Sequence, residues 1–280
     1  MKILITGING FVGGQFLKFL NKKNIKCDGV VRSKSNTKNI VKNLKIKSKL
    51  INIYEADLIK KKDTKVLINK TKPDIIFHFA GVTRGSEKNN DHKITKNLIS
   101  SMSNKSILVF PSTDKVYIND PKKNKETSKI VDHFDNCYEK NKFISEKLII
   151  KKLIKFYILR LGPVHSTSNL SLFKNKNLID KLLNNLKNKK KVLVFSNVYR
   201  SFCRVEELSL FFYNLVYKKK IPFGIYNIGS NLVSYHDRLI KLARSMKIST
   251  KKIIPKFGII EPKKQELDTN KIRRQGFIFT

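Results

Sequence analysis

The chain has 280 residues, 40% of them hydrophobic, and a formal net charge of +38 at pH 7. This length and composition allow one large α/β core, alone or with a smaller second lobe. No apolar run approaches the roughly 18 residues that span a bilayer, and the N-terminus lacks the pattern of a signal peptide. We therefore expect a cytoplasmic protein with no membrane partner.

The excess positive charge is almost entirely lysine and is spread along the whole chain. A basic protein that binds nucleic acid would cluster this charge on one face and carry a basic-aromatic module, and no such module is present. The distribution instead indicates a compositional bias, so we predict no nucleic-acid partner. The three cysteines, Cys27, Cys137 and Cys203, are far apart and odd in number, which predicts neither a disulfide framework nor a metal site.

Strand and helix patterns alternate over the first part of the chain. A buried strand is expected at residues 2–6, followed by a glycine turn and a helix over 11–20. Further strands are expected at residues 27–31, 50–54, 74–79, 106–111 and 156–161, and a helix over about 137–154. Helical stretches between strands predict right-handed crossovers and an α/β fold with a doubly wound parallel sheet.

The regular alternation of strand and helix patterns ends near residue 162. Beyond it, helices are expected near 178–186 and 236–246. We predict one larger α/β domain over residues 1–162 and a smaller lobe over 163–280. Segments of this lobe, such as 226–229, are expected to return to the main sheet, so the two parts need not fold independently.

Three glycines, Gly7, Gly10 and Gly13, lie between the first strand and the first helix. Such a turn brings the backbone close to a pyrophosphate, and a side chain at these positions would obstruct the approach. The N-terminus of the helix offers N–H groups and the positive end of its dipole to phosphates. The strand-turn-helix context predicts NAD or NADP binding, with tight packing that involves no ligand as the alternative. Residues 1–162 are therefore predicted to form a Rossmann-type NAD(P)-binding domain, and residues 163–280 a smaller substrate-binding lobe.

The end of the second strand bears on the choice of cofactor. An acidic residue there binds the ribose 2′-hydroxyl of NAD, whereas a basic residue favours the 2′-phosphate of NADP. The strand ends in Val31 and Arg32, which favours NADP. An arginine that stacks on adenine in an NAD enzyme is the alternative.

Tyr138 and Lys142 are four residues apart in a predicted helix and therefore share one face. A tyrosine with a pKa near ~10 can exchange protons near neutral pH only if a nearby cation stabilises its phenolate. This spacing alone is weak evidence for a catalytic pair, because it occurs by chance in a lysine-rich chain. Its position, at the start of the helix after the fifth strand, strengthens the prediction of a catalytic pair.

Short motifs follow one another along the chain in a specific order and spacing. They are Thr6-Gly7-x-x-Gly10-Phe11-x-Gly13, Asp57-Leu58, His78-Phe79-Ala80-Gly81, Ser112-Thr113-x-x-Val116-Tyr117, Tyr138-x-x-x-Lys142, Arg160-x-x-x-Val164, Arg200-Ser201-Phe202 with Val205-Glu206-Glu207, Tyr226-Asn227-Ile228-Gly229 and Leu267-Asp268-Thr269-x-Lys271. In this order the sequence resembles the extended short-chain dehydrogenase/reductases, the NAD-dependent epimerases and dehydratases that modify nucleotide sugars. The resemblance covers essentially the whole chain.

The resemblance implies a role for each matching residue. Tyr138 would exchange a proton with the reacting carbinol or carbonyl, Lys142 would lower the pKa of Tyr138 and hold the nicotinamide ribose, and Thr113 would hydrogen-bond the reacting oxygen. Arg200 would grip the diphosphate of a nucleotide-diphosphate sugar, a task suited to a forked guanidinium. Cofactor contacts are implied for Gly7, Gly10, Phe11, Val12 and Gly13 at the pyrophosphate, Asp57 and Leu58 at the adenine, Ala80 and Gly81 beside the cofactor, and Pro163 and Val164 near the nicotinamide. Capping and packing are the alternative for Asp57, Leu58 and Arg160, and a homodimer is a further expectation from the family.

The sequence departs from the family pattern at several positions near the predicted site. Asp91-His92 replaces an asparagine at a helix start, Glu139 replaces a glycine after the tyrosine, and His165-Ser166 replaces Tyr-Gly. None of these departures removes a predicted catalytic group. The chain is also short for the family, so a trimmed substrate lobe is expected.

The residues are compatible with two reactions, epimerisation of a nucleotide sugar and reduction of a nucleotide-linked 4-keto sugar. Thr113, Tyr138 and Lys142 suffice for both. A 4,6-dehydratase would be expected to carry an acidic pair after the threonine, and here Asp114 is followed by Lys115. Dehydration is therefore the less favoured alternative. A regulatory NADP-binding relative without activity is the alternative from another class, which the presence of Tyr138 and Lys142 disfavours.

Overall fold

A computed structural model describes most of the chain and divides it into two compact units. The described residues are 1–33, 44–81, 90–118, 122–131, 133–134, 136–166, 177–217, 221–258 and 263–280. Unit 1 comprises Met1–Val116, Val131–Arg160 and Ser209–Tyr226, and unit 2 comprises Tyr117–Ile130, Leu161–Leu208 and Asn227–Thr280. The chain thus passes between the units several times, whereas the sequence analysis placed a single boundary after residue 162. The assignment of cofactor to one part and substrate to the other stays a prediction.

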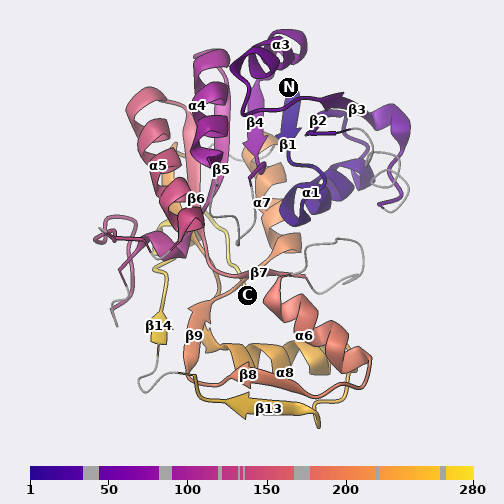
Figure 1. Cartoon of the computed structure of the whole chain (residues 1–280), viewed down its shortest axis with the longest axis vertical. Helices are drawn as coiled ribbons and strands as arrows, with labels where there is room; N and C mark the ends of the chain where they lie inside the picture. The colour runs from indigo at the N-terminus through magenta and orange to yellow at the C-terminus, as the bar shows by residue number, and fades with distance from the viewer. Residues whose placement is uncertain are drawn as a thin grey trace. The chain divides into compact units, whose positions relative to one another are not determined.

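A seven-stranded sheet forms the centre of the fold, with the strand order β11-β6-β5-β4-β1-β2-β3 (Figure 1). Strand β1 pairs in parallel with both β2 and β4, and β2–β3 and β4–β5 are also parallel. The strand order reverses between β1 and β4, and open α/β sheets bind ligands at such a reversal. The strands are β1 (Ile3–Thr6), β2 (Cys27–Val31), β3 (Ile51–Glu55), β4 (Ile75–His78), β5 (Ile107–Thr113), β6 (Phe156–Leu161) and β11 (Gly224–Ile228).

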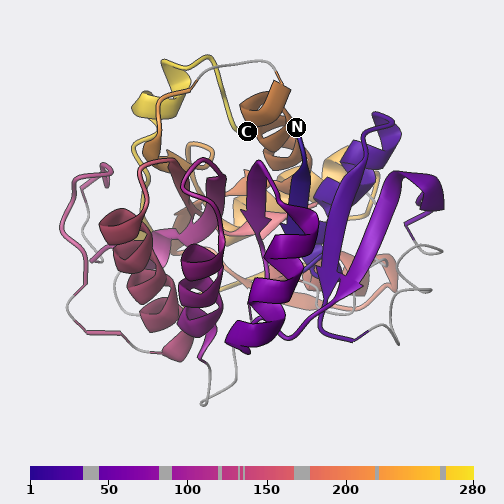
Figure 2. The same cartoon turned by 90° about the horizontal axis from the view of Figure 1, so that it is seen from above.

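Helices cover both faces of this sheet, as the view from above in Figure 2 shows. Successive strand residues point to opposite faces. Leu4, Ile76 and Leu108 belong to a buried cluster with residues of the helices on one face, and the Phe77 ring lies 4.6 Å from Phe16 and 5.5 Å from Phe212 on the other. The helices of the first face are α3 (Lys61–Thr71), α4 (Asp91–Ser101) and α5 (Cys137–Lys152), and those of the second are α1 (Phe11–Lys22) and α7 (Val205–Tyr217).

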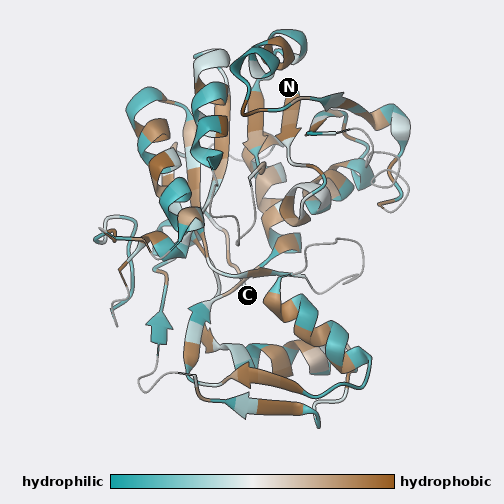
Figure 3. Cartoon of the chain, in the orientation of Figure 1, coloured by the Kyte–Doolittle hydropathy of each residue, from teal (hydrophilic) through white to brown (hydrophobic). Residues whose placement is uncertain are grey.

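Unit 2 has its own core and, over its described residues, three small sheets. Its buried cluster includes Leu183, Val194, Phe202 and Leu239, which come from two helices and two strand regions. Its elements are β7 (Val164–His165), α6 (Leu178–Lys187), β8 (Val192–Phe195), β9 (Val198–Ser201), β10 (Cys203–Arg204), β12 (Leu232–Ser234), α8 (Tyr235–Ser245), β13 (Ile253–Lys256), β14 (Lys263–Gln265) and α9 (Asn270–Arg273). Strands β7–β10 and β8–β13 form two-stranded sheets, and β9 lies between β12 and β14. Figure 3 shows the hydrophobic colouring along β8 and the central strands of unit 1.

The α/β fold class predicted from the sequence is confirmed. Strands β2 and β6 occupy the predicted residues, the other four predicted strands lie within two residues of their predicted bounds, and residues 224–228 join the main sheet as β11. Helix α7 was not predicted. None of the helices in the described ranges is long and apolar enough to cross a membrane.

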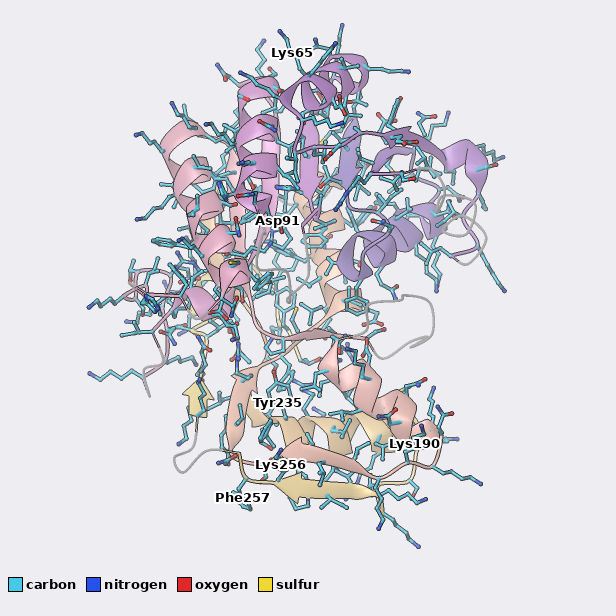
Figure 4. The ribbon with its side chains drawn as sticks, in the orientation of Figure 1. Lys65, Asp91, Lys190, Tyr235, Lys256 and Phe257 are labelled. Carbon is cyan, nitrogen blue, oxygen red and sulfur yellow. The ribbon has the colours of Figure 1, made fainter. Side chains whose placement is uncertain are left out.

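Lysine side chains project from elements of both units. Figure 4 labels Lys65 on α3, Lys190 after α6 and Lys256 at the end of β13. Lysine is rarely buried in proteins, because its charge is solvated at the surface. That nucleic acid is not a partner stays a prediction.

Candidate functional site

The turn between β1 and α1 is built so that only glycine fits at two positions. Gly7 has a φ of +68°, and a Cβ atom there would lie 2.8 Å from the backbone nitrogen of Ala80. A Cβ atom on Gly13 would lie 2.4 Å from the Gly7 carbonyl oxygen. The Gly10 N–H donates to that same oxygen at 2.9 Å, and α1 begins at the next residue, Phe11. The close-packed turn therefore directs the N-terminus of α1, with Phe11 and Val12 in its first turn, toward the place where a pyrophosphate would bind.

The ends of β2 and β3 carry the residues predicted near the adenosine. Arg32 directly follows β2 and is exposed. Leu58 is buried, and its carbonyl oxygen accepts from Asn97 Nδ2 at 3.0 Å and from Thr64 Oγ1 at 3.1 Å. Asp57 Oδ1 accepts from the Ile59 N–H at 3.2 Å. Asp57 and Leu58 therefore help to hold the loop after β3 in place. Their contact with a cofactor stays a prediction.

A row of hydrogen bonds centred on His78 connects the sheet to α4 and α5. The Ala80 N–H donates to Thr6 Oγ1 at 3.0 Å, and this hydroxyl lies 3.1 Å from His78 Nδ1. On the other side, His78 Nε2 lies 3.1 Å from Thr95 Oγ1, which donates to Ser145 Oγ at 3.0 Å. Complete burial lowers the pKa of His78 to about 3, so the ring is neutral. A neutral imidazole has one donor and one acceptor nitrogen, and each of the two lies at hydrogen-bond distance from a hydroxyl group, Thr6 on one side and Thr95 on the other.

A cavity in unit 1 brings four of the predicted residues together, namely Ala80, Gly81, Tyr138 and Lys142. They come from the end of β4 and from the first turns of α5. The same cavity is lined by His78, Asp91, Thr95, Phe110, Asn141 and Ser145. Figure 4 shows Asp91 at the end of α4 that lies toward the carboxyl ends of the strands, where ligands of open α/β sheets bind.

Lys142 is held by the end of strand β5. Its Nζ donates to the Pro111 carbonyl oxygen at 2.6 Å and lies 4.5 Å from the centre of the Phe110 ring and 5.9 Å from that of Tyr138. Burial lowers the pKa of this lysine to about 8, and the negative charges of Asp91 and Glu146 oppose the change. The ammonium group is therefore poised to lose its proton within the range in which enzymes work.

Thr113 is the last residue of β5 and is buried. Its Oγ1 accepts from the Lys115 N–H at 3.3 Å and lies 3.4 Å from Asp114 Oδ1, a length at which a hydrogen bond is weak. The hydroxyl can therefore turn toward a ligand at little cost. The carbonyl of Pro111, which holds Lys142, lies two residues earlier in the same strand.

The remaining predicted residues belong to unit 2. Arg200 is buried in β9, where it is paired with Val233 and Gln265 on the two neighbouring strands. Pro163 accepts from the Cys203 N–H at 3.0 Å, and Val164 begins β7. The roles predicted for these three residues stay predictions.

Several residues that shape the site were not predicted as site residues. Asn141 Oδ1 accepts from the backbone N–H of His92 at 3.2 Å and lies 2.6 Å from its Nδ1, which joins α5 to α4. Glu146 forms a buried ion pair with Arg160, with Oε2 lying 2.7 Å from Nη2. The departures at His92 and Glu139 were visible in the sequence as unusual residues, but a single chain does not say what they contact. No group of three or more potential metal ligands occurs within the described ranges.

The sheet order, the glycine turn at its point of reversal and the cavity beside it define a protein of the Rossmann type. Residues 3–229 match the model of the NAD dependent epimerase/dehydratase family. The chain belongs to this family.

Proteins similar to this chain include UDP-glucose 4-epimerases and dTDP-4-dehydrorhamnose reductases. A UDP-glucose 4-epimerase from Mycoplasma genitalium is 34% identical over 127 residues, a match that covers 41% of this chain and 37% of that protein. The structure of a dTDP-4-dehydrorhamnose reductase from Bacillus anthracis in complex with NADP is similar with a TM-score of 0.75 and 17% identity, covering 100% of this chain and 94% of that one. A UDP-glucose 4-epimerase from Thermotoga maritima with UDP-glucose has a TM-score of 0.76 and 18% identity, with the same coverage. At these identities the structural likeness concerns the fold.

Proposed function

We propose that the protein binds NAD or NADP together with a nucleotide-diphosphate sugar, and that it acts as an epimerase or as a 4-keto-sugar reductase. The observation that carries this proposal is the cavity that Tyr138 and Lys142 share with Ala80 and Gly81. The backbone of Ala80 is also the surface against which Gly7 packs. A proton-transfer pair therefore lies beside a turn that fits a dinucleotide.

The residues of the cavity supply the proton transfer that must accompany hydride transfer at a carbinol or carbonyl. The dinucleotide, when bound, accepts or returns the hydride. Tyr138 gives its phenolic proton to the carbonyl oxygen during reduction and removes the hydroxyl proton during oxidation. Lys142 stabilises the phenolate by its positive charge, and the Thr113 hydroxyl turns from Asp114 to hydrogen-bond the same oxygen.

A substrate with a diphosphate would suit Arg200, because a guanidinium group binds phosphate oxygens with two parallel hydrogen bonds. The relatives whose structures contain UDP-glucose or UDP agree with this substrate class. A cytoplasmic homodimer without a metal, membrane or nucleic-acid partner completes the proposal.

Turnover of a sugar nucleotide tests the function directly. The purified protein would be incubated with NADH or NADPH and a panel of UDP-, dTDP- and GDP-linked sugars and 4-keto sugars. Isomerised sugar without net use of the cofactor identifies an epimerase, and stoichiometric oxidation of the cofactor identifies a reductase. Loss of water from the sugar would instead identify a dehydratase, and no change with any substrate would argue for a regulatory cofactor-binding protein.

The rate of carbonyl reduction is expected to fall as the pH rises above about 8. The active form for reduction needs a protonated Tyr138 and a charged Lys142, and the pKa of Lys142 is lowered to about 8. Initial rates of the wild type at saturating substrate would be measured from pH 6 to pH 10, a range that brackets this value. A profile that stays flat to pH 10 would contradict this assignment, and Lys142→Met should be slow at every pH and lack the inflection near 8.

Arg32→Asp is expected to reverse the preference between the two cofactors. Arg32 is exposed after β2, where it can pair with a 2′-phosphate, whereas an aspartate accepts from a 2′-hydroxyl. The ratio of the Kd values for NADPH and NADH, measured by fluorescence titration, should change by about tenfold or more toward NADH, since charge-assisted hydrogen bonds contribute about 1.5–3 kcal/mol. Unchanged affinity for both cofactors would mean that Arg32 contacts neither.

A further inference from the structure

Lys115 and Glu139 form an ion pair next to the two residues proposed to contact the reacting oxygen. Lys115 Nζ lies 2.8 Å from Glu139 Oε1, and the two side chains are 27% and 6% exposed. A carboxylate buried to this extent is costly unless an opposite charge compensates it. Lys115 provides that charge, so the two side chains hold each other in place.

The ion pair joins the end of strand β5 to the start of helix α5. Lys115 lies in the short 3-10 helix η3 (Asp114–Val116), and its backbone N–H donates to Thr113 Oγ1 at 3.3 Å. Glu139 directly follows Tyr138, and its own N–H donates to the Asn136 side chain that caps α5, at 3.1 Å. Breaking the bond between Lys115 and Glu139 would therefore remove one link between the strand end that presents Thr113 and the helix turn that presents Tyr138. The bond from Lys142 Nζ to the Pro111 carbonyl oxygen would remain and keep α5 against β5.

Glu139 directly follows Tyr138 in α5, and Lys115 reaches this helix turn through its bond to Glu139. Other charged or titratable groups on the described elements around Tyr138 include His78 on β4, Asp91 and His92 on α4, Asp114 on η3, and Cys137, Lys140, Lys142 and Glu146 on α5. All of these groups remain when Lys115 or Glu139 is replaced. Because Lys115 and Glu139 have opposite signs, their effects on the phenol oppose each other, and the combined effect is smaller than that of the nearer charge alone.

We propose that the Lys115–Glu139 ion pair is a positioning device of the active site, which fixes Thr113 and Tyr138 relative to each other while adding little net charge beside the phenol. The inference rests on the proposed function for the roles of Thr113 and Tyr138. Lys115 and Glu139 are positioning residues, since they act through their neighbours.

The electrostatic part can be tested without any sugar substrate. The phenolate absorbance of Tyr138 would be titrated as the difference between each protein and the same protein with Tyr138→Phe. Lys115→Met leaves the negative charge of Glu139 and should raise the pKa of Tyr138 by about one unit, whereas Glu139→Gln leaves the positive charge and should lower it by a similar amount. The double variant should return the pKa to within a few tenths of the wild-type value.

The positioning part is tested by turnover. Each single variant, and the double variant as well, should lower kcat by about 10- to 100-fold with little change in the KM for the dinucleotide, because small displacements of reacting groups are costly. The double variant is decisive, since it should restore the pKa of Tyr138 but not kcat. Lys115→Arg, which keeps the charge and can bind the carboxylate, should retain most of the activity.

A matched control is Lys123→Met, which breaks the more exposed ion pair with Glu266 at 3.1 Å. It should change neither the pKa of Tyr138 nor kcat. The inference is wrong if Lys115→Met and Glu139→Gln shift the pKa in the same direction or not at all, or if kcat stays at the wild-type value in a folded double variant. A wild type that converts no sugar nucleotide would instead overturn the proposed function, and the titration would still decide whether the ion pair acts on Tyr138.

Discussion

Tyr138→Phe is expected to lower kcat by about 10²- to 10⁴-fold with every substrate that the wild type converts. The change removes one oxygen atom and with it the only proton that the side chain can exchange. Tyr138 lines the same cavity as Lys142, and the two groups cannot act as a proton-transfer pair when the phenol is absent. The rate would be measured with the active sugar nucleotide found in the panel.

The same variant should bind the dinucleotide with an affinity close to that of the wild type. The glycine turn, whose fit depends on Gly7 and Gly13, is unchanged by the substitution. A suitable control is Tyr217→Phe, because Tyr217 ends α7 and is 44% exposed. Full activity of Tyr138→Phe would show that another group exchanges the proton.

Glu146→Gln should lower the free energy of unfolding by about 3–5 kcal/mol, because it removes one charge of a buried ion pair and leaves the other. Glu146 and Arg160 are each 2% exposed, and Oε2 of Glu146 lies 2.7 Å from Nη2 of Arg160. Arg160 Nε contributes further contacts at 3.2 Å to both carboxylate oxygens. The loss would be a large share of the 5–15 kcal/mol that stabilise an ordinary domain.

Urea unfolding would measure this effect, with Glu266→Gln as the comparison. Glu266 pairs with Lys123 at a half-exposed position, and exposed pairs contribute about 0–1 kcal/mol. Replacement of both partners by apolar residues, as in Glu146→Leu with Arg160→Met, should recover much of the lost stability. Equal losses in Glu146→Gln and Glu266→Gln would contradict the importance given to burial.

The main sheet was predictable because its strands are short apolar runs separated by helical patterns. Residues 156–161, for example, are almost continuously apolar, as expected for a strand covered on both faces. Helix α7 was missed because apolar residues dominate its sequence Leu208-Ser209-Leu210-Phe211-Phe212-Tyr213, which weakens the helical period. The small sheets of unit 2 have strands of two to four residues, too short for a period to be visible.

The candidate site was predictable where its residues are neighbours in sequence. Tyr138 and Lys142 share a face of one helix, and their spacing together with the position of that helix after the fifth strand indicated a pair. The contacts of His78 with Thr6 and Thr95 cross 72 and 17 residues, and that of Lys115 with Glu139 crosses 24. Such pairings follow from how strands and helices are arranged in space, which the pattern of one sequence does not define.

The His78 row has a consequence for how the cavity responds to its surroundings. A neutral imidazole held between two oriented hydroxyl groups has one proton and one lone pair, and both are in use. With a pKa of about 3, the ring stays neutral when the pH changes over the range near neutrality. The charge of the cavity wall formed by β4 therefore does not change with pH. Changes in the charge of the site come from other groups, such as Lys142, which lines the same cavity.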